Sequence, residues 1–131
     1  MRSMIIGLVA AAALSSAAFA QSLTPAAIAT YANVSDDAVL SYNLVGLHVQ
    51  DIADHTVGEI KDVVLEKGQL VGYIVWVGGS VGLGDRYVLV EAASVGLTWE
   101  DADHKWKAVI NASKDDLAAA PEFKYQGKFK H

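Results

Sequence analysis

The run Leu70-Val71-Gly72-Tyr73-Ile74-Val75-Trp76-Val77 decides the fold class of this 131-residue chain. It shows almost no polar alternation, and β-branched and aromatic side chains dominate it. A strand with one face in water alternates apolar and polar residues, so a strand without that alternation has both faces covered by protein. We therefore expect this run to be a central strand of a small barrel or part of an interface.

Five further runs rich in Val, Ile, Tyr and Trp predict strands at 45–50, 57–65, 86–90, 95–99 and 106–110. Glycine-rich or Asp-rich breaks separate them. Lys67-Gly68 predicts a tight hairpin turn, because glycine tolerates a positive φ, and Asp101-Ala102-Asp103-His104 predicts a second turn. The pattern is typical of a mainly β domain of about six strands.

One short helix is expected after the last strand. Ser113-Lys114-Asp115-Asp116 places a capping hydroxyl before two acids, good helix formers follow from Leu117 to Ala120, and Pro121 ends the pattern. The carboxylates of Asp115 and Asp116 are therefore interpreted as helix caps.

The amino terminus has the pattern of a Sec-type export signal. Arg2 supplies a positive charge, an apolar stretch follows from Met4, and Ala18-Phe19-Ala20 matches a cleavage site. We expect residues 1–20 to be a signal peptide cleaved after Ala20, leaving a periplasmic or secreted protein with no stable membrane span. An uncleaved anchor is the alternative, but Ser15 and Ser16 interrupt a stretch that is already short for a span of about 20 residues.

Residues 21–40 contain few bulky apolar side chains and predict a flexible tether, in which Thr24-Pro25 is compatible with a short helix reaching Tyr31. The domain is expected at 41–125, and 126–131 form a short tail. The aromatic and basic residues of 123–131 would suit an acidic partner or a membrane surface, but a partly disordered tail is the simpler interpretation.

Composition excludes several classes of function. The chain has 15 acidic and 10 basic side chains and a formal net charge of -5, which argues against binding to nucleic acid or to anionic membranes. It contains no cysteine, so neither disulfides nor thiol redox chemistry can be proposed.

The segment Gly78-Gly79-Ser80-Val81-Gly82-Leu83-Gly84 is the densest glycine cluster. Phosphate-binding loops lead into a helix, whereas this segment leads into a predicted strand and lacks the Gly-Lys-Ser/Thr motif. We interpret it as a structural or interaction loop.

Metal binding and catalysis find little support in the sequence. Two turns combine potential ligands, namely Asp51, Asp54 and His55 in the first and Asp101, Asp103 and His104 in the second. Neither pairs two histidines at helical spacing, and Asp and His are common in solvated turns for backbone hydrogen bonding. The chain has no Gly-x-Ser-x-Gly motif, so we predict no enzyme activity and no cofactor. Trp76, Trp99 and Trp106 are interpreted as core residues, with an aromatic ligand cleft as the alternative.

Short motifs at 41–125 occur in a characteristic order. Val57-Gly58-Glu59-Ile60-Lys61-Asp62-Val63 is followed by Val77-Gly78-Gly79, Gly82-Leu83-Gly84 and Val88-Leu89-Val90. In this order they resemble the PRC-barrel domain family, which includes the H subunit of the photosynthetic reaction centre and the carboxyl-terminal domain of RimM. The landmarks that carry the resemblance are Gly46, Gly58, Asp62, Gly68, Arg86 and Pro121.

The resemblance implies a small, strongly bent β-barrel with one short carboxyl-terminal helix. It also implies an interaction or assembly module, with another protein or a second copy of the chain as partner. Ser80 and Glu91 depart from the family pattern, which often has an aromatic residue and a proline there, so we expect the loop to suit a different partner. Asp62 is expected to accept local hydrogen bonds that stabilise the fold. The alternative function is a small-ligand-binding or metal-binding protein of the cell envelope.

Overall fold

The computed structural model describes residues 27–78 and 84–131. The signal peptide predicted at 1–20 and the loop residues Gly79, Ser80, Val81, Gly82 and Leu83 lie outside the described residues. The chain divides into two units, Met1–Ser35 and Asp36–His131. Residues 27–35 form neither helix nor strand, so the helix expected to reach Tyr31 is absent from its described part.

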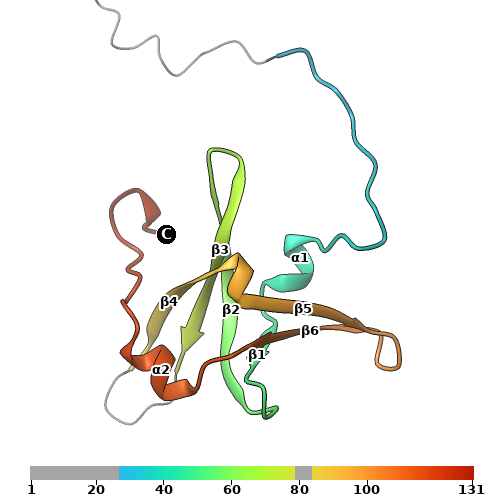
Figure 1. Ribbon diagram of the computed structural model, residues 1–131. Coiled ribbons are helices and arrows are strands. Elements are labelled where there is room, and N and C mark those ends of the chain that lie inside the picture. The colour runs from blue at the N-terminus through green and yellow to red at the C-terminus, as the bar shows by residue number, and fades with distance from the viewer. Residues whose placement is uncertain (1–26, 79–83) are drawn as a thin grey trace, which may run out of the picture. The chain divides into compact units, whose positions relative to one another are not determined.

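The second unit contains the six predicted strands (Figure 1). They are β1 (His48–Gln50), β2 (Thr56–Glu66), β3 (Gln69–Val77), β4 (Arg86–Glu91), β5 (Val95–Glu100) and β6 (Lys105–Ile110). Five of them match the expected bounds within a residue. The first is shorter than predicted, because a helical turn, α1 (Ser41–Leu44), occupies the preceding residues, and the chain then turns at Gly46 with φ at +95°.

The strands form one bent sheet in the order β4-β3-β2-β1-β6-β5. Neighbouring strands are antiparallel except β1 and β6, which are parallel. Irregularities in the β2–β3 register fall between Ile60 and Asp62 and between Val64 and Leu65, and such bulges bend a strand and increase its twist. The sheet has two edges, β4 and β5, so pairing does not close the barrel.

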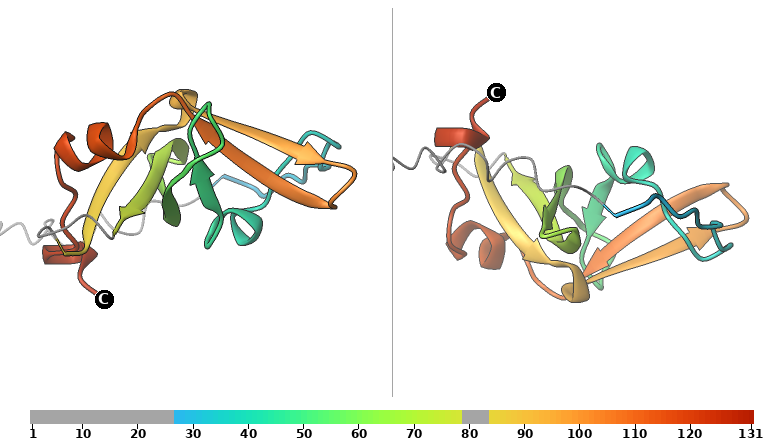
Figure 2. Two further views of the ribbon diagram at one scale, coloured as in Figure 1. Left: turned by 90° about the horizontal axis from the view of Figure 1, so that it is seen from below. Right: turned by 90° about the horizontal axis from the view of Figure 1, so that it is seen from above.

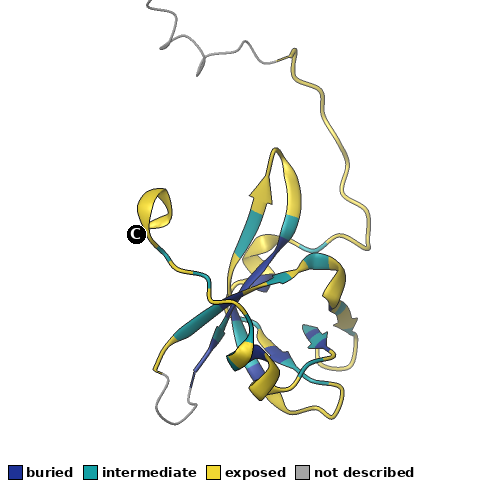
Figure 3. Ribbon diagram, turned by 60° about the vertical axis from the view of Figure 1, so that its left-hand side comes forward, coloured by how far each residue is buried: buried dark blue, intermediate teal, exposed yellow. Residues whose placement is uncertain are grey.

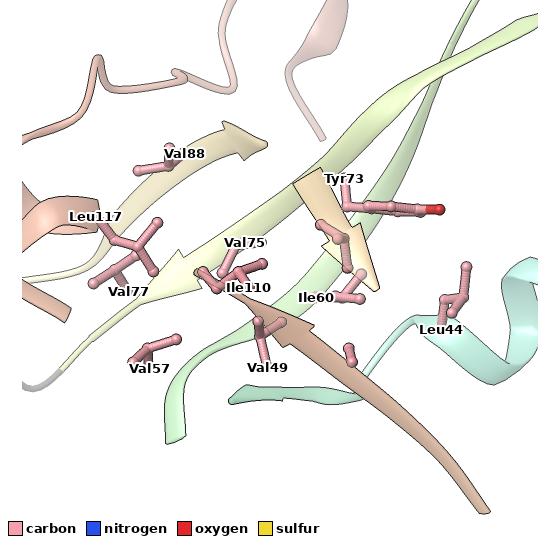
Figure 4. Close-up of a cluster of buried hydrophobic side chains, with 12 residues drawn as sticks. Leu44, Val49, Val57, Ile60, Tyr73, Val75, Val77, Val88, Ile110 and Leu117 are labelled. Carbon is pink, nitrogen blue, oxygen red and sulfur yellow. The ribbon is translucent and has the colours of Figure 1, made fainter. Parts of the chain in front are cut away.

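The predicted central position of β3 is confirmed. This strand pairs with β2 on one side and β4 on the other. Tyr73, Val75 and Val77 face the core, where Val49 of β1 and Ile110 of β6 join them (Figure 4). Every strand and both α-helices contribute to this cluster, so the bent sheet encloses a single core.

The helix predicted after β6 is α2 (Lys114–Ala119), and it has a complete capping box. The Ser113 hydroxyl accepts a hydrogen bond from the Asp116 amide at 3.0 Å, and the Asp116 carboxylate accepts one from the Ser113 amide at 2.9 Å. The bond from the Ser113 amide is the main cause that lowers the pKa of the Asp116 carboxyl below its ordinary value. Leu117 points into the core and docks the helix on the sheet.

The second face of β3 is also covered. Ile74 is only 2% exposed although it lies outside the core cluster. Rings of the C-terminal segment, residues 123–131, pack with Tyr87 beside this face, with centroids of Tyr125 5.1 Å from both Tyr87 and Phe123. This packing differs from the partly disordered tail expected, because the apolar face that receives the rings exists only in the folded sheet. Figure 3 shows the outer end of the segment still exposed.

Candidate functional site

Three landmark glycines occupy positions where a side chain would disturb the backbone. Gly46 and Gly68 have positive φ angles, +95° and +78°, and Gly68 completes the β2–β3 turn after Lys67, whose φ is 52°. Gly58 lies where β2 approaches β3, and an ideal Cβ there would be 2.8 Å from the Trp76 carbonyl oxygen. These glycines therefore shape the fold and form no ligand site by themselves.

Asp62 lies on the outer face of β2, where its carboxylate accepts a hydrogen bond from the Val63 amide at 2.9 Å. It is also close to Tyr125 of the C-terminal segment. Burial raises the pKa of the Tyr125 phenol, and the negative charge of Asp62 raises it further. Asp62 is therefore a local hydrogen-bond acceptor beneath the C-terminal segment.

Arg86 and Pro121 lie where the chain leaves α2 and passes β4. The Arg86 guanidinium donates a hydrogen bond to the Ala120 carbonyl, and its Nη1 lies 3.6 Å from a Glu122 carboxylate oxygen. Just beyond Pro121, the Phe123 amide donates to the Tyr87 carbonyl at 2.7 Å. Together these contacts hold the chain after α2 against β4, so one of the two sheet edges is partly covered.

The two described ends of the glycine-rich loop are Gly78 and Gly84. Gly78 is buried against the Trp76 ring, where an ideal Cβ would be 1.9 Å from a ring carbon. The Trp76 indole N–H donates to the Asp85 carboxylate at 3.1 Å, which links the strands on either side of the loop. Trp76 thus supports the base of the loop.

In the first of the two turns considered for metal binding, the Asp51 carboxylate bonds to its own turn. Asp51 accepts hydrogen bonds from the Ala53 and His55 amides, at 2.8 and 2.9 Å. The bond from the His55 amide is the main cause that lowers the pKa of the Asp51 carboxyl. Within residues 27–78 and 84–131, no three His, Cys, Asp or Glu side chains are grouped so that they could hold a metal ion.

The β5–β6 hairpin forms an arm that extends away from the other strands (Figure 2). At its base Val95, Ala108 and Ile110 are buried in the core, whereas none of residues 98–107 is buried. Trp99 and Trp106 face each other across the two strands with ring centroids 5.6 Å apart. Trp99 remains 43% exposed, so the aromatic pair belongs to the surface of the arm and not to the core that the sequence predicted.

An open groove lies between the arm and the chain leading into β1, with a volume of about 600 Å³. One wall is formed by Gly46, Leu47 and His48, and the other by residues 105–107 of β6. Asp54 and Glu100 also line it. An ion pair crosses from Lys107 to Asp54 at 3.1 Å. The arrangement offers an aromatic ring, strand backbone and charges of both signs to a ligand.

Comparison with protein families matches the PRC-barrel domain to residues 36–117, more than half of the chain. The chain belongs to the PRC-barrel domain family. The resemblance drawn from the motifs at 41–125 is thereby confirmed, together with the mainly β, strongly bent fold. The groove and the arm lie within the matched residues.

Among solved structures, the PRC barrel is similar to RimM of Pseudomonas aeruginosa, a candidate 16S ribosomal RNA processing protein. The identity is 25%, the TM-score is 0.37, and the match covers 59% of this chain. The chain matches 45% of that protein, less than half of its length. No match is found among curated proteins. None of the described helices is long and apolar enough to cross a membrane.

The groove could not be recognised from the sequence. Three of its residues, Trp106, Asp54 and Asp103, are candidate ligand residues in the sequence, but no motif marks Leu47, His48 or Lys107. The residues of the groove come together because β1 and β6, about sixty residues apart in the chain, pair in parallel. No local motif predicts such pairing. The nearest available signal was the placement of Trp99 and Trp106 on either side of a short turn, which suggests a cross-strand pair.

Proposed function

We propose that this PRC barrel is a non-enzymatic module that acts through protein contact or assembly in the cell envelope. Its partner in this proposal is another protein or a second copy of the chain, and no cofactor takes part. The Ala18-Phe19-Ala20 cleavage motif and the apolar stretch before it support export to the periplasm or beyond.

The observation that carries the proposal is the exposed arm. A two-stranded hairpin is marginally stable in water unless a third strand or another element covers it. Beyond Leu97 the arm lacks such cover among the described residues, yet it carries Trp99 and Trp106. Tryptophan is enriched where protein interfaces derive most of their binding energy. The arm is therefore the surface best suited to a protein partner.

The first test is mild amine-reactive crosslinking in the native envelope fraction, followed by co-purification and mass spectrometry. We expect a reproducible partner, or a homodimer, crosslinked through Lys105 or Lys107 of the arm. Lys67, at the opposite β2–β3 turn, is the internal control and should not crosslink to the partner.

Two double variants make the test specific. Trp99→Ala with Trp106→Ala should abolish partner recovery, because it removes both rings from the arm. Leu65→Ala with Leu70→Ala should leave recovery unchanged, since these side chains form an exposed apolar cross-strand pair on the other hairpin.

Recovery of the monomer alone would overturn the proposal. A stoichiometric metal or small molecule on that monomer, purified without a histidine tag, would replace it with the ligand-binding alternative.

A further inference from the structure

The inner edge of β6 is only half paired. The strand pairs with β5 along all of Lys105–Ile110, but with β1 only at Ala108 and Val109. Among the described residues, no strand pairs with 105–107 on the side of the groove. This edge therefore offers backbone groups to a further strand.

The backbone of the opposite wall is bonded elsewhere, since the Leu47 amide donates to the Leu44 carbonyl at 2.9 Å. The Gly46 amide donates to the Ile60 carbonyl at 2.7 Å, and the Ile60 amide donates to the Leu47 carbonyl at 2.8 Å. Both bonds tie this wall to β2, on the side away from the groove. β1 and β6 thus diverge from their short parallel pairing and leave a wedge beside the unpaired edge of β6.

Such a wedge suits an extended polypeptide. Backbone N–H and C=O groups require partners, and an added strand supplies them where water otherwise does. Strand addition of this kind obtains affinity from the main chain and specificity from alternate side chains. The three residues of β6 that are free on this side correspond to a contact of about 10 Å of strand.

The side chains of the groove select the chemistry of that polypeptide. Trp106 and Leu47 supply apolar surface. Lys107 is paired with Asp54 at 3.1 Å, and Lys105 lies 4.0 Å from Asp103. Glu100 lies opposite Lys105 in the β5–β6 register but forms no ion pair among the described residues. The groove is therefore slightly acidic, since its lining carboxylates (Asp54, Glu100 and Asp103) outnumber its two lysines. It favours a segment with an apolar side chain and a basic one.

We propose that the groove between β1 and β6 binds an extended segment of a partner protein as an added strand. An aromatic or aliphatic side chain of that segment packs on Trp106, and a lysine or arginine pairs with Glu100. This inference rests on the proposed function and specifies which side of the arm receives the partner and by what chemistry.

Selection from a phage-displayed library of short random peptides tests the proposal on the purified protein. The selected peptides should combine an aromatic or aliphatic residue with a basic one. Binding of a synthetic selected peptide should slow hydrogen exchange of backbone amides within 46–48 and 105–107. Protection confined to the outer edge of β5, or failure to select any peptide, would overturn the proposal.

The two tryptophans provide a matched pair of variants. Trp106→Ala should weaken peptide binding by about tenfold or more, as expected for an aromatic anchor. Trp99→Ala removes the same Trp–Trp contact from the arm but leaves the groove lining intact, so it should bind like the parent. Equal weakening by both would contradict the groove as the site. Glu100→Gln should weaken basic peptides and leave neutral ones unaffected.

The groove and the proposed function can fail separately. A native partner crosslinked to the arm, with no protection of 46–48 and 105–107 when it binds, would refute the groove and leave the module function standing. Binding of an oligosaccharide such as maltotetraose in the groove, with no peptide bound, would refute the added strand. Absence of any partner or peptide would refute both.

Discussion

Replacing Gly72 by alanine should strongly destabilise the protein, because β3 and β4 are too close there for a side chain. An ideal Cβ on Gly72 would be 2.0 Å from the Val90 carbonyl oxygen, whereas ordinary contact begins at 3.4 Å. The difference of 3.4 − 2.0 Å means that the two strands must separate by about 1.4 Å. The atom that the new Cβ would meet is a backbone oxygen, so no side-chain rotation can relieve the clash.

The expected loss follows from what that separation breaks. Forcing extra volume into a packed site costs about 1–3 kcal/mol, and each disrupted ladder hydrogen bond adds about 1 kcal/mol. We expect Gly72→Ala to lower the free energy of unfolding by about 2–4 kcal/mol, a large part of the 5–15 kcal/mol typical of a domain. Urea denaturation followed by tryptophan fluorescence measures this difference.

Gly96 of β5 is the matched control. An ideal Cβ on this residue meets only the Val109 carbonyl oxygen, at 3.7 Å, which is ordinary contact. Gly96→Ala should therefore be neutral or stabilising by up to about 1 kcal/mol, since alanine restricts the unfolded chain. Equal unfolding midpoints for the two variants, or a Gly72→Ala protein as stable as the parent, would refute the close-approach argument.

Four further predictions concern α2, the segment that follows it and their contacts with the sheet. Arg86→Leu should lower the free energy of unfolding by about 1–3 kcal/mol in urea titrations, because the carbonyl that accepts its hydrogen bond loses its donor. Ser113→Ala should cost about 1 kcal/mol by the same measurement, since it removes the cap of α2. The pKa of the Asp116 carboxyl is lowered from 3.8 in the folded chain, so the ionised carboxylate stabilises the fold above pH 3.8. This stabilisation is lost as the pH falls through the folded pKa. Asp116→Asn should therefore reduce the acid sensitivity of the unfolding midpoint. Burial and the charge of Asp62 raise the pKa of the Tyr125 phenol from 10.0 in the folded chain. As the pH rises past 10.0, ionisation of this phenol therefore favours the unfolded chain. Asp62→Asn should lower the pKa of Tyr125 in an ultraviolet absorbance titration.

Specific outcomes would contradict the predictions for Arg86, Ser113 and Asp62. Glu122→Gln affects only a partly exposed pair and should cost less than about 1 kcal/mol, so an effect as large as that of Arg86→Leu would point to the ion pair and away from the carbonyl contact. A Ser113→Ala protein with parental stability would show that Leu117 alone holds α2. An unchanged Tyr125 titration in Asp62→Asn would remove the charge of Asp62 as a cause.

Local chemistry made much of the fold predictable. The strand at 70–77, the turn at Lys67-Gly68 and the capping box of Ser113 and Asp116 each depend on residues within a few positions of one another, and the structure confirms all three. The helical turn α1 escaped prediction because only Leu44 among its four residues is buried, so no periodic apolar face reveals it. The packing of the C-terminal segment escaped prediction because its aromatic residues lie beside Ile74 and Tyr87, on a face that exists only once the sheet has formed.

The sequence by itself determined the family, the six strands, the hairpin turns and the helix cap of this protein, because these are encoded by apolar periodicity and by the preferences of glycine, serine and aspartate. Only the tertiary structure decided that β1 and β6 pair in parallel and then diverge, that Trp106 lines the resulting groove, and that Arg86 secures the chain after α2. These contacts join residues far apart in the chain, and their energies depend on distances that no local pattern records.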